Sequence, residues 1–97
     1  MAECVFEDRL VRDLEKAGWF VRRIAYRGKR TATDLLVGYD GYVAFVELKD
    51  RGEIPRPDQA KEHKKMRKHG LQVFVFDNYH DAWTTLNAVA AAWDRTT

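Results

Sequence analysis

The chain has 97 residues, of which 45% are hydrophobic and 33% are charged, and its formal net charge is +2. This composition argues against disorder, and we expect residues 1–97 to form one small folded domain. Cys4 is the one cysteine, which excludes an internal disulfide and a thiolate zinc site and suits a reducing cytoplasm. No apolar run approaches the roughly 18 residues that a membrane span needs.

The hydrophobic pattern predicts a mixed α/β domain in the order α-β-β-β-α-β-α, in which a central, largely antiparallel sheet is flanked by helices. The expected elements are a helix over residues 3–17, strands over 19–25, 34–39 and 42–48, a helix over 58–69, a strand over 71–76, and a last helix capped by Asn78. The strand over 42–48 is apolar on both faces, so we expect it in the middle of the sheet. Residues 26–32 are expected to form a basic loop that contains glycine.

Asp40-Gly41 predicts a tight hairpin turn between the second and third strands, because type I′ turns favour these residues at their two central positions. In that register Asp34 falls directly opposite Glu47. Directly opposed residues share a face of the sheet with Cβ atoms roughly 5 Å apart, and two like charges there are destabilising. A three-residue loop would instead place Val46 opposite Asp34 and separate the two carboxylates.

Two carboxylates at one end of a hairpin need a cation between them. Lys49 lies two residues after Glu47, so it shares the face and is one candidate. The other is a divalent metal, and a donor set made only of oxygen favours Mg²⁺ or Mn²⁺. The spacing alone leaves open a structural ion cluster of Asp34, Glu47 and Lys49.

Asp34 followed by Glu47-Leu48-Lys49 resembles the Asp…(Asp/Glu)-x-Lys core of the PD-(D/E)XK nucleases, and the closer match is to their VRR-NUC branch in its compact, stand-alone phage form. The resemblance runs from about Glu7 to Asn78. It includes Glu7-x-x-Leu10-x-x-x-Leu14-x-x-x-Gly18-Trp19, Thr33-Asp34-Leu35-Leu36-Val37, the strand from Val43 to Lys49, Pro55-Arg56-Pro57-Asp58-Gln59, and Phe76-Asp77. Ala32-Thr33 departs from the Gly/Ala-Pro pair that often precedes the family's aspartate.

The resemblance implies a metal site built from both parts of the motif. Asp34, Glu47 and the main-chain carbonyl of Leu48 would ligate Mg²⁺ or Mn²⁺. The glutamate of the first helix, Glu7, would hold water on the metal or a second ion. Glu3, one turn earlier, is the alternative for that role.

The resemblance also implies the reaction, which is hydrolysis of DNA phosphodiester bonds by an endonuclease. Lys49 would orient the attacking water and stabilise the charge that develops on the phosphate. Gln59 would hydrogen-bond Lys49, a water on the metal or a phosphate oxygen. The products would carry 5′-phosphate and 3′-hydroxyl ends.

The implied partner is DNA, bound in the cytoplasm of a bacterium or a phage-infected host, with no membrane involved. Stand-alone relatives are implied to act as homodimers on branched DNA such as four-way (Holliday) junctions, where a two-fold dimer supplies two symmetric cuts. One alternative is a nucleic-acid-binding module that keeps the fold but does not cut. The other is a junction resolvase of the archaeal type, which shares the core.

Basic residues gather in two stretches that suit contact with phosphate, although a solvated helix face gives the same pattern. The candidates are Arg27, Lys29 and Arg30 in the basic loop, and Arg56, Lys61, Lys64, Lys65 and Lys68 around the second helix. His63, His69 and His80 have no spacing typical of metal ligands. Trp83 and Trp93 are expected to pack in the core, with part of that helix face available to a dimer interface.

Overall fold

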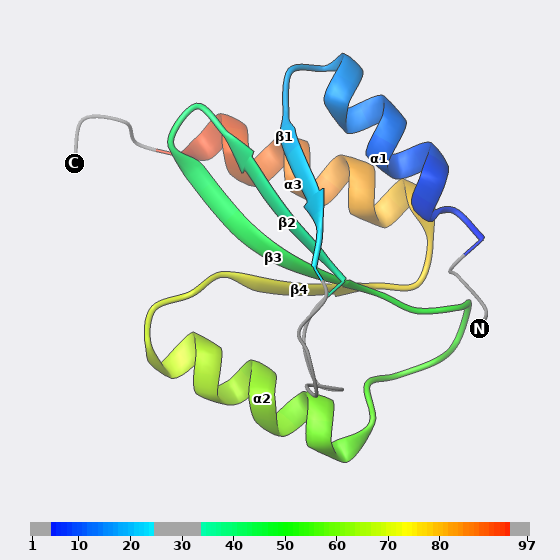
Figure 1. Cartoon of the computed structure of the whole chain (residues 1–97), viewed down its shortest axis with the longest axis vertical. Coiled ribbons are helices and arrows are strands. Elements are labelled where there is room, and N and C mark those ends of the chain that lie inside the picture. Colours follow the sequence, from blue (N-terminus) through cyan, green and yellow to red (C-terminus); the bar gives the residue numbers. More distant parts are fainter. Residues whose placement is uncertain (1–4, 25–33, 94–97) are drawn as a thin grey trace.

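The computed structural model describes residues 5–24 and 34–93 and shows a mixed α/β fold in the predicted order (Figure 1). Its elements are α1 (Glu7–Lys16), β1 (Phe20–Arg23), β2 (Leu35–Tyr39), β3 (Tyr42–Leu48), α2 (Pro57–Lys68), β4 (Val73–Phe76) and α3 (Tyr79–Ala92). The sheet order is β1-β2-β3-β4. The first three strands are antiparallel and β4 runs parallel to β3, so β3 is a central strand, as predicted. The predicted basic loop over residues 26–32, with Arg27, Lys29 and Arg30, lies outside the described residues, and so does Glu3.

The ends of two helices explain why the following strands begin later than predicted. Gly18 has a φ of 99°, and the Trp19 N–H donates to the Leu14 carbonyl at 3.0 Å. This bond closes the last turn of α1, so Trp19 belongs to the helix terminus and β1 starts one residue later. Gly70, with a φ of 84°, and Leu71 end α2 in the same way.

The hairpin turn between β2 and β3 has the predicted type. Asp40 and Gly41 have φ angles of 50° and 91°, the positive values that a type I′ turn requires. The strands then pair in consecutive register as far as Leu35 opposite Val46, which confirms the two-residue turn and excludes the three-residue loop. The register therefore brings the start of β2 to the carboxyl end of β3.

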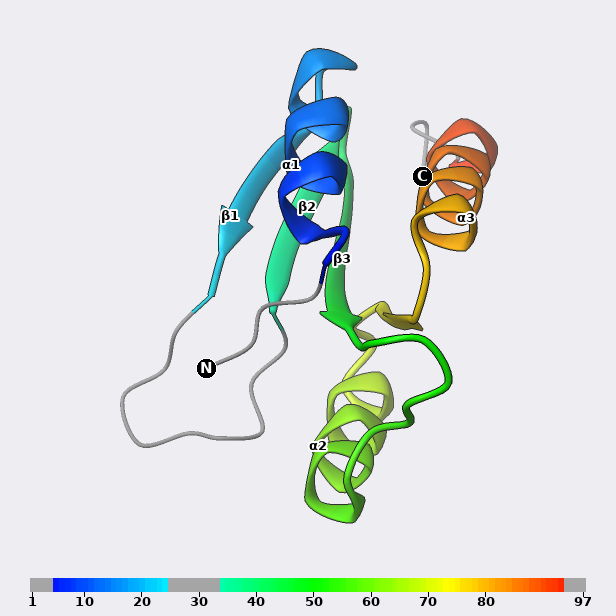
Figure 2. The ribbon, with the colours of Figure 1, turned by 90° about the vertical axis from the view of Figure 1, so that its right-hand side faces the viewer.

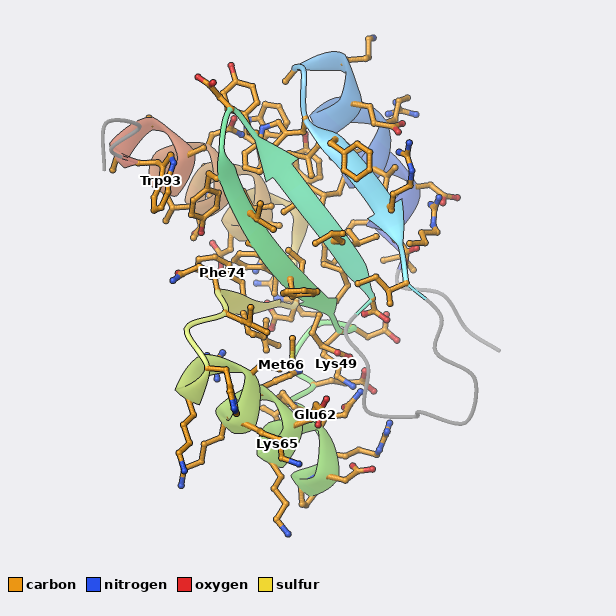
Figure 3. All side chains as sticks on the ribbon, turned by 60° about the vertical axis from the view of Figure 1, so that its left-hand side comes forward. Lys49, Glu62, Lys65, Met66, Phe74 and Trp93 are labelled. Atoms are coloured by element: carbon orange, nitrogen blue, oxygen red, sulfur yellow. The ribbon has the colours of Figure 1, made fainter. Side chains whose placement is uncertain are left out.

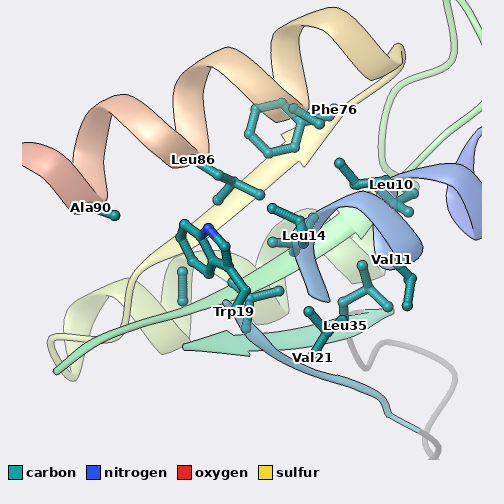
Figure 4. Packing of buried hydrophobic residues seen from close by; sticks show 14 of the residues in the cluster. Leu10, Val11, Leu14, Trp19, Val21, Leu35, Phe76, Leu86 and Ala90 are labelled. Atoms are coloured by element: carbon teal, nitrogen blue, oxygen red, sulfur yellow. The ribbon is translucent and has the colours of Figure 1, made fainter. Parts of the chain in front are cut away.

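The hydrophobic core lies between one face of the sheet and the helices α1 and α3 (Figures 2 and 4). Leu10 and Leu14 of α1, Leu35 of β2 and Leu86 of α3 are all fully buried there. Of the described residues in this cluster none comes from α2. That helix instead packs against β4 and reaches Glu47 near the carboxyl end of β3.

The last helix begins as predicted, because the Asn78 side chain accepts a hydrogen bond from the Asp81 N–H at 2.8 Å. Trp83 packs against the core, as expected. The prediction for Trp93 was wrong: it follows the end of α3 and is 41% exposed, and its ring makes an edge contact with the ring of Tyr42. Within the described ranges, none of the helices has the length and apolar character needed to cross a membrane.

Candidate active site

Glu47 is the centre of the candidate site, near the carboxyl end of β3. Its side chain points away from the main core, because it alternates with Val46 and Leu48, which face α1 and α3. The packing of α2 on that side leaves Glu47 only 2% exposed. One carboxylate oxygen, Oε2, accepts a hydrogen bond from the Gln59 amide at 3.0 Å and lies 3.5 Å from Nζ of Lys49. The other oxygen, Oε1, is buried and has no hydrogen-bond partner among the described residues.

Gln59 connects the start of α2 to the two charged residues of β3. It is buried in the first turn of the helix, which begins at Pro57. Its side-chain oxygen accepts from the Arg56 N–H at 3.1 Å and from Nζ of Lys49 at 2.8 Å. Of the partners expected for this amide, the structure therefore shows Lys49, and Figure 3 shows Lys49 lying between the sheet and α2.

Asp34 lies immediately before β2 and is held by its backbone and its side chain. Its carbonyl accepts from the Ile24 N–H at 2.9 Å, and its N–H donates to the Val46 carbonyl at 3.0 Å. Its carboxylate accepts from the Leu48 N–H at 2.7 Å. The pairing of β2 with β3 ends at Leu35 and Val46, so Asp34 and Glu47 do not form the cross-strand pair that the turn predicted. Asp34 is still close enough to Glu47 for its charge to act on that carboxyl group.

The surroundings of Glu47 disfavour its ionised form, which a nearby cation would stabilise. Burial, and next to it the negative charge of Asp34, raise the pKa of Glu47 to about 7, against a smaller lowering by Lys49 and Gln59. In a strand the N–H and C=O of one residue point to the same side, so the Leu48 carbonyl faces the Asp34 side as its N–H does. A buried oxygen without a partner, a neighbouring carboxylate and a carbonyl form an oxygen-only donor set that fits a small divalent ion.

Glu7 is placed differently from the other acids. It is 8% exposed in the first turn of α1, and its Oε2 accepts from Nε of Arg23 at 2.6 Å. The Arg23 guanidinium also binds Asp8 at 2.6 Å. In the described parts of the chain, no three His, Cys, Asp or Glu side chains gather closely enough to hold a metal ion. The metal role expected for Glu7 therefore stays a prediction.

The basic candidates on and beside α2 are exposed, as contact with DNA requires. They are Arg56, Lys61, Lys64, Lys65 and Lys68. The sequence did not point to His63, which is 1% exposed and places Nε2 at 3.6 Å from Oε1 of Glu47. The one available signal was its position four residues after Gln59, which puts both side chains on one face of the helix.

Sheet order, helix placement and the Asp34, Glu47 and Lys49 positions together define the restriction-endonuclease-like PD-(D/E)XK class. No family model matches the chain. It is 37% identical over 73 residues to "Putative nuclease p44" of Acyrthosiphon pisum secondary endosymbiont phage 1, a match that covers 74% of this chain and 78% of the relative.

The solved structures that share the fold include the following two. One is described as a VRR_NUC domain, with a TM-score of 0.77 and 33% identity over 86% of this chain and 91% of that one. The chain thus belongs to the VRR-NUC family, as its motifs indicated. The other is Hjc of Archaeoglobus fulgidus, described as a Holliday junction resolvase from an archaeal hyperthermophile, with a TM-score of 0.57 and 25% identity over 75% of this chain and 65% of that one.

Proposed function

We propose that this protein is an endonuclease that depends on Mg²⁺ or Mn²⁺ and hydrolyses phosphodiester bonds in DNA. The observation that carries the proposal is the buried Glu47 carboxylate, which lies beside Asp34 and is contacted by Gln59 and Lys49. Family membership supports a nuclease, and the oxygen-only donor set supports a hard divalent ion.

In the proposed mechanism, Asp34, Glu47 and the Leu48 carbonyl would hold the ion. When bound, the ion supplies positive charge that polarises a phosphoryl oxygen and favours ionisation of water. The Lys49 ammonium orients the attacking water and offsets the negative charge that grows on the phosphate. Gln59 fixes Lys49 and Glu47 relative to each other, so that this geometry exists before the substrate arrives.

A cleavage assay with labelled DNA tests this proposal. We expect the wild type to cut with Mg²⁺ or Mn²⁺ and to be inactive with EDTA. Glu47→Ala is expected to abolish cleavage while keeping DNA binding, and Glu15→Ala, which removes an exposed carboxylate on α1, serves as the matched control. A wild type that binds DNA but cuts with neither metal would contradict the proposal and support the non-cleaving module.

We further propose that the enzyme acts as a homodimer on branched DNA. The sheet face opposite the main core supports a second copy, because Phe20 and Val43 are 52% and 54% exposed there and Leu36 and Phe45 lie between them and the site. The structural likeness to an archaeal junction resolvase supports the substrate. Size-exclusion chromatography with light scattering tests the dimer, and a monomer with and without DNA would refute it.

The substrate is tested by comparing a four-way junction, a flap and plain duplex of the same sequence. We expect paired, symmetric cuts in the junction and slower cutting of the duplex. Equal rates on all three would contradict selectivity for branched DNA and leave the nuclease proposal intact.

A further inference from the structure

His63 is buried in a helix of which no described residue belongs to the main hydrophobic core. The buried residues of α2 are Gln59 and His63, one turn apart on the same face. Both side chains are directed at the Glu47 carboxylate, Gln59 at Oε2 and His63 at Oε1. An apolar side chain at position 63 would fill this space without leaving a polar atom in need of a partner. The contact with Glu47 thus distinguishes His63 from a residue that only fills volume.

The two facing atoms complement each other. Nε2 of His63 and Oε1 of Glu47 are buried, and neither has a hydrogen-bond partner among the described residues. They are 3.6 Å apart. An approach of about 0.6 Å would bring them to the usual length of an N–H···O hydrogen bond, and such bonds in active sites often shorten when the ligand binds. An imidazole with its proton on Nε2 would present a donor to Oε1, which can only accept when Glu47 is ionised.

We infer that His63 is a positioning residue, whose Nε2–H holds Oε1 of Glu47 so that the carboxylate is preset to receive a divalent ion. The inference rests on the proposed function, because the ion is the one that Asp34 and Glu47 would bind. Gln59 fixes Oε2 and His63 fixes Oε1, and each oxygen keeps a further lone pair for the ion. Groups that hold a ligand in this way typically change metal affinity by roughly 10-fold to 100-fold when they are removed.

The experiment measures Mn²⁺ binding to the full chain by isothermal titration calorimetry and by the electron paramagnetic resonance signal of free Mn²⁺. His63→Leu removes the N–H with little change in volume, and we expect it to weaken Mn²⁺ binding by roughly 10-fold to 100-fold. His63→Gln, whose amide nitrogen reaches the position of Nε2, is expected to recover most of the affinity. His80→Leu is the matched control, because His80 is exposed on α3, and it should bind Mn²⁺ as the wild type does.

Three outcomes would overturn the inference. If His63→Leu lowers the melting temperature but binds Mn²⁺ as tightly as the wild type, His63 only fills space. If His63→Leu does not fold by circular dichroism, His63→Gln is compared with His63→Asn, whose amide is too short to reach Glu47, and equal affinities reject the inference. If the folded wild type binds no Mn²⁺, the proposed metal site fails together with the inference that rests on it.

Discussion

Replacing Glu47 by glutamine should make the metal-free protein more stable at neutral pH. The folded state raises the pKa of Glu47 from its ordinary 4.5 to about 7, mainly through burial and secondarily through the charge of Asp34. The folded protein thus binds this proton more tightly than the unfolded chain. Its contribution to stability is complete below pH 4.5 and is lost as the pH rises through about 7.

The magnitude follows from the same two values. The difference between 4.5 and about 7 corresponds to roughly 3 kcal/mol in the free energy of unfolding. Glutamine stays neutral at every pH and keeps an oxygen that accepts from the Gln59 amide. We therefore expect wild type and Glu47→Gln to be similar near pH 4.5, and the variant to be more stable by up to roughly 3 kcal/mol at pH 8.

The assay is urea unfolding between pH 4.5 and 8, followed by tryptophan fluorescence and circular dichroism. Glu15→Gln, which neutralises an exposed carboxylate, is the control and should follow the wild type. Adding Mn²⁺ at about 100 times its dissociation constant should stabilise the wild type by about 2.7 kcal/mol and leave Glu47→Gln unchanged. Stability curves of wild type and variant that stay parallel over this pH range would refute the reasoning about Glu47.

Three further predictions concern the rest of the fold and the DNA surface. Leu86→Ala should lower the free energy of unfolding by about 2–5 kcal/mol in urea titrations, because Leu86 is fully buried between α3 and the sheet. Asn78→Ala should lower it by about 1 kcal/mol through loss of the cap on the Asp81 N–H, and Asn78→Ser should restore most of that. Lys61→Ala with Lys65→Ala should weaken DNA binding and reduce the slope of log affinity against log salt by up to about 1.8; an unchanged slope would show that these exposed lysines do not contact phosphate.

The sequence predicted the hairpin well because its register depends on local chemistry. Asp40-Gly41 accepts the positive φ angles of one particular turn, and that turn determines which residues of β2 and β3 face each other. The order of the elements was predictable for a similar reason, since the spacing of hydrophobic residues and the glycines that end helices are local features of the sequence. The exact strand starts were not, because the carbonyls at the ends of α1 and α2 accept from the residues that follow.

The parts of the site that pattern could not predict depend on packing between distant elements. Arg23 on β1 reaches Glu7 on α1 only because that helix lies beside the strand, and no spacing rule links residues 16 positions apart. His63 is a comparable case. His63 lies on a helix rich in exposed lysines, where the sequence pattern gives no sign that it is buried. Its burial depends on the packing of α2 against Glu47.

The attachment of α2 to the sheet and the chemistry of the site rest on the same atoms. The side-chain oxygen of Gln59 accepts from the backbone at the start of α2 and from Lys49, and its amide nitrogen donates to Glu47. A tighter apolar contact would hold the helix more strongly but would remove these polar groups from the carboxylate. Ionisation of the buried Glu47 lowers the stability of the folded protein, but the same packing orients the carboxylate for a cation. A bound ion would keep Glu47 ionised, and an ionised carboxylate is a better acceptor for Gln59 than a protonated one. Ion binding would therefore also strengthen the hydrogen bond that attaches α2 to the sheet.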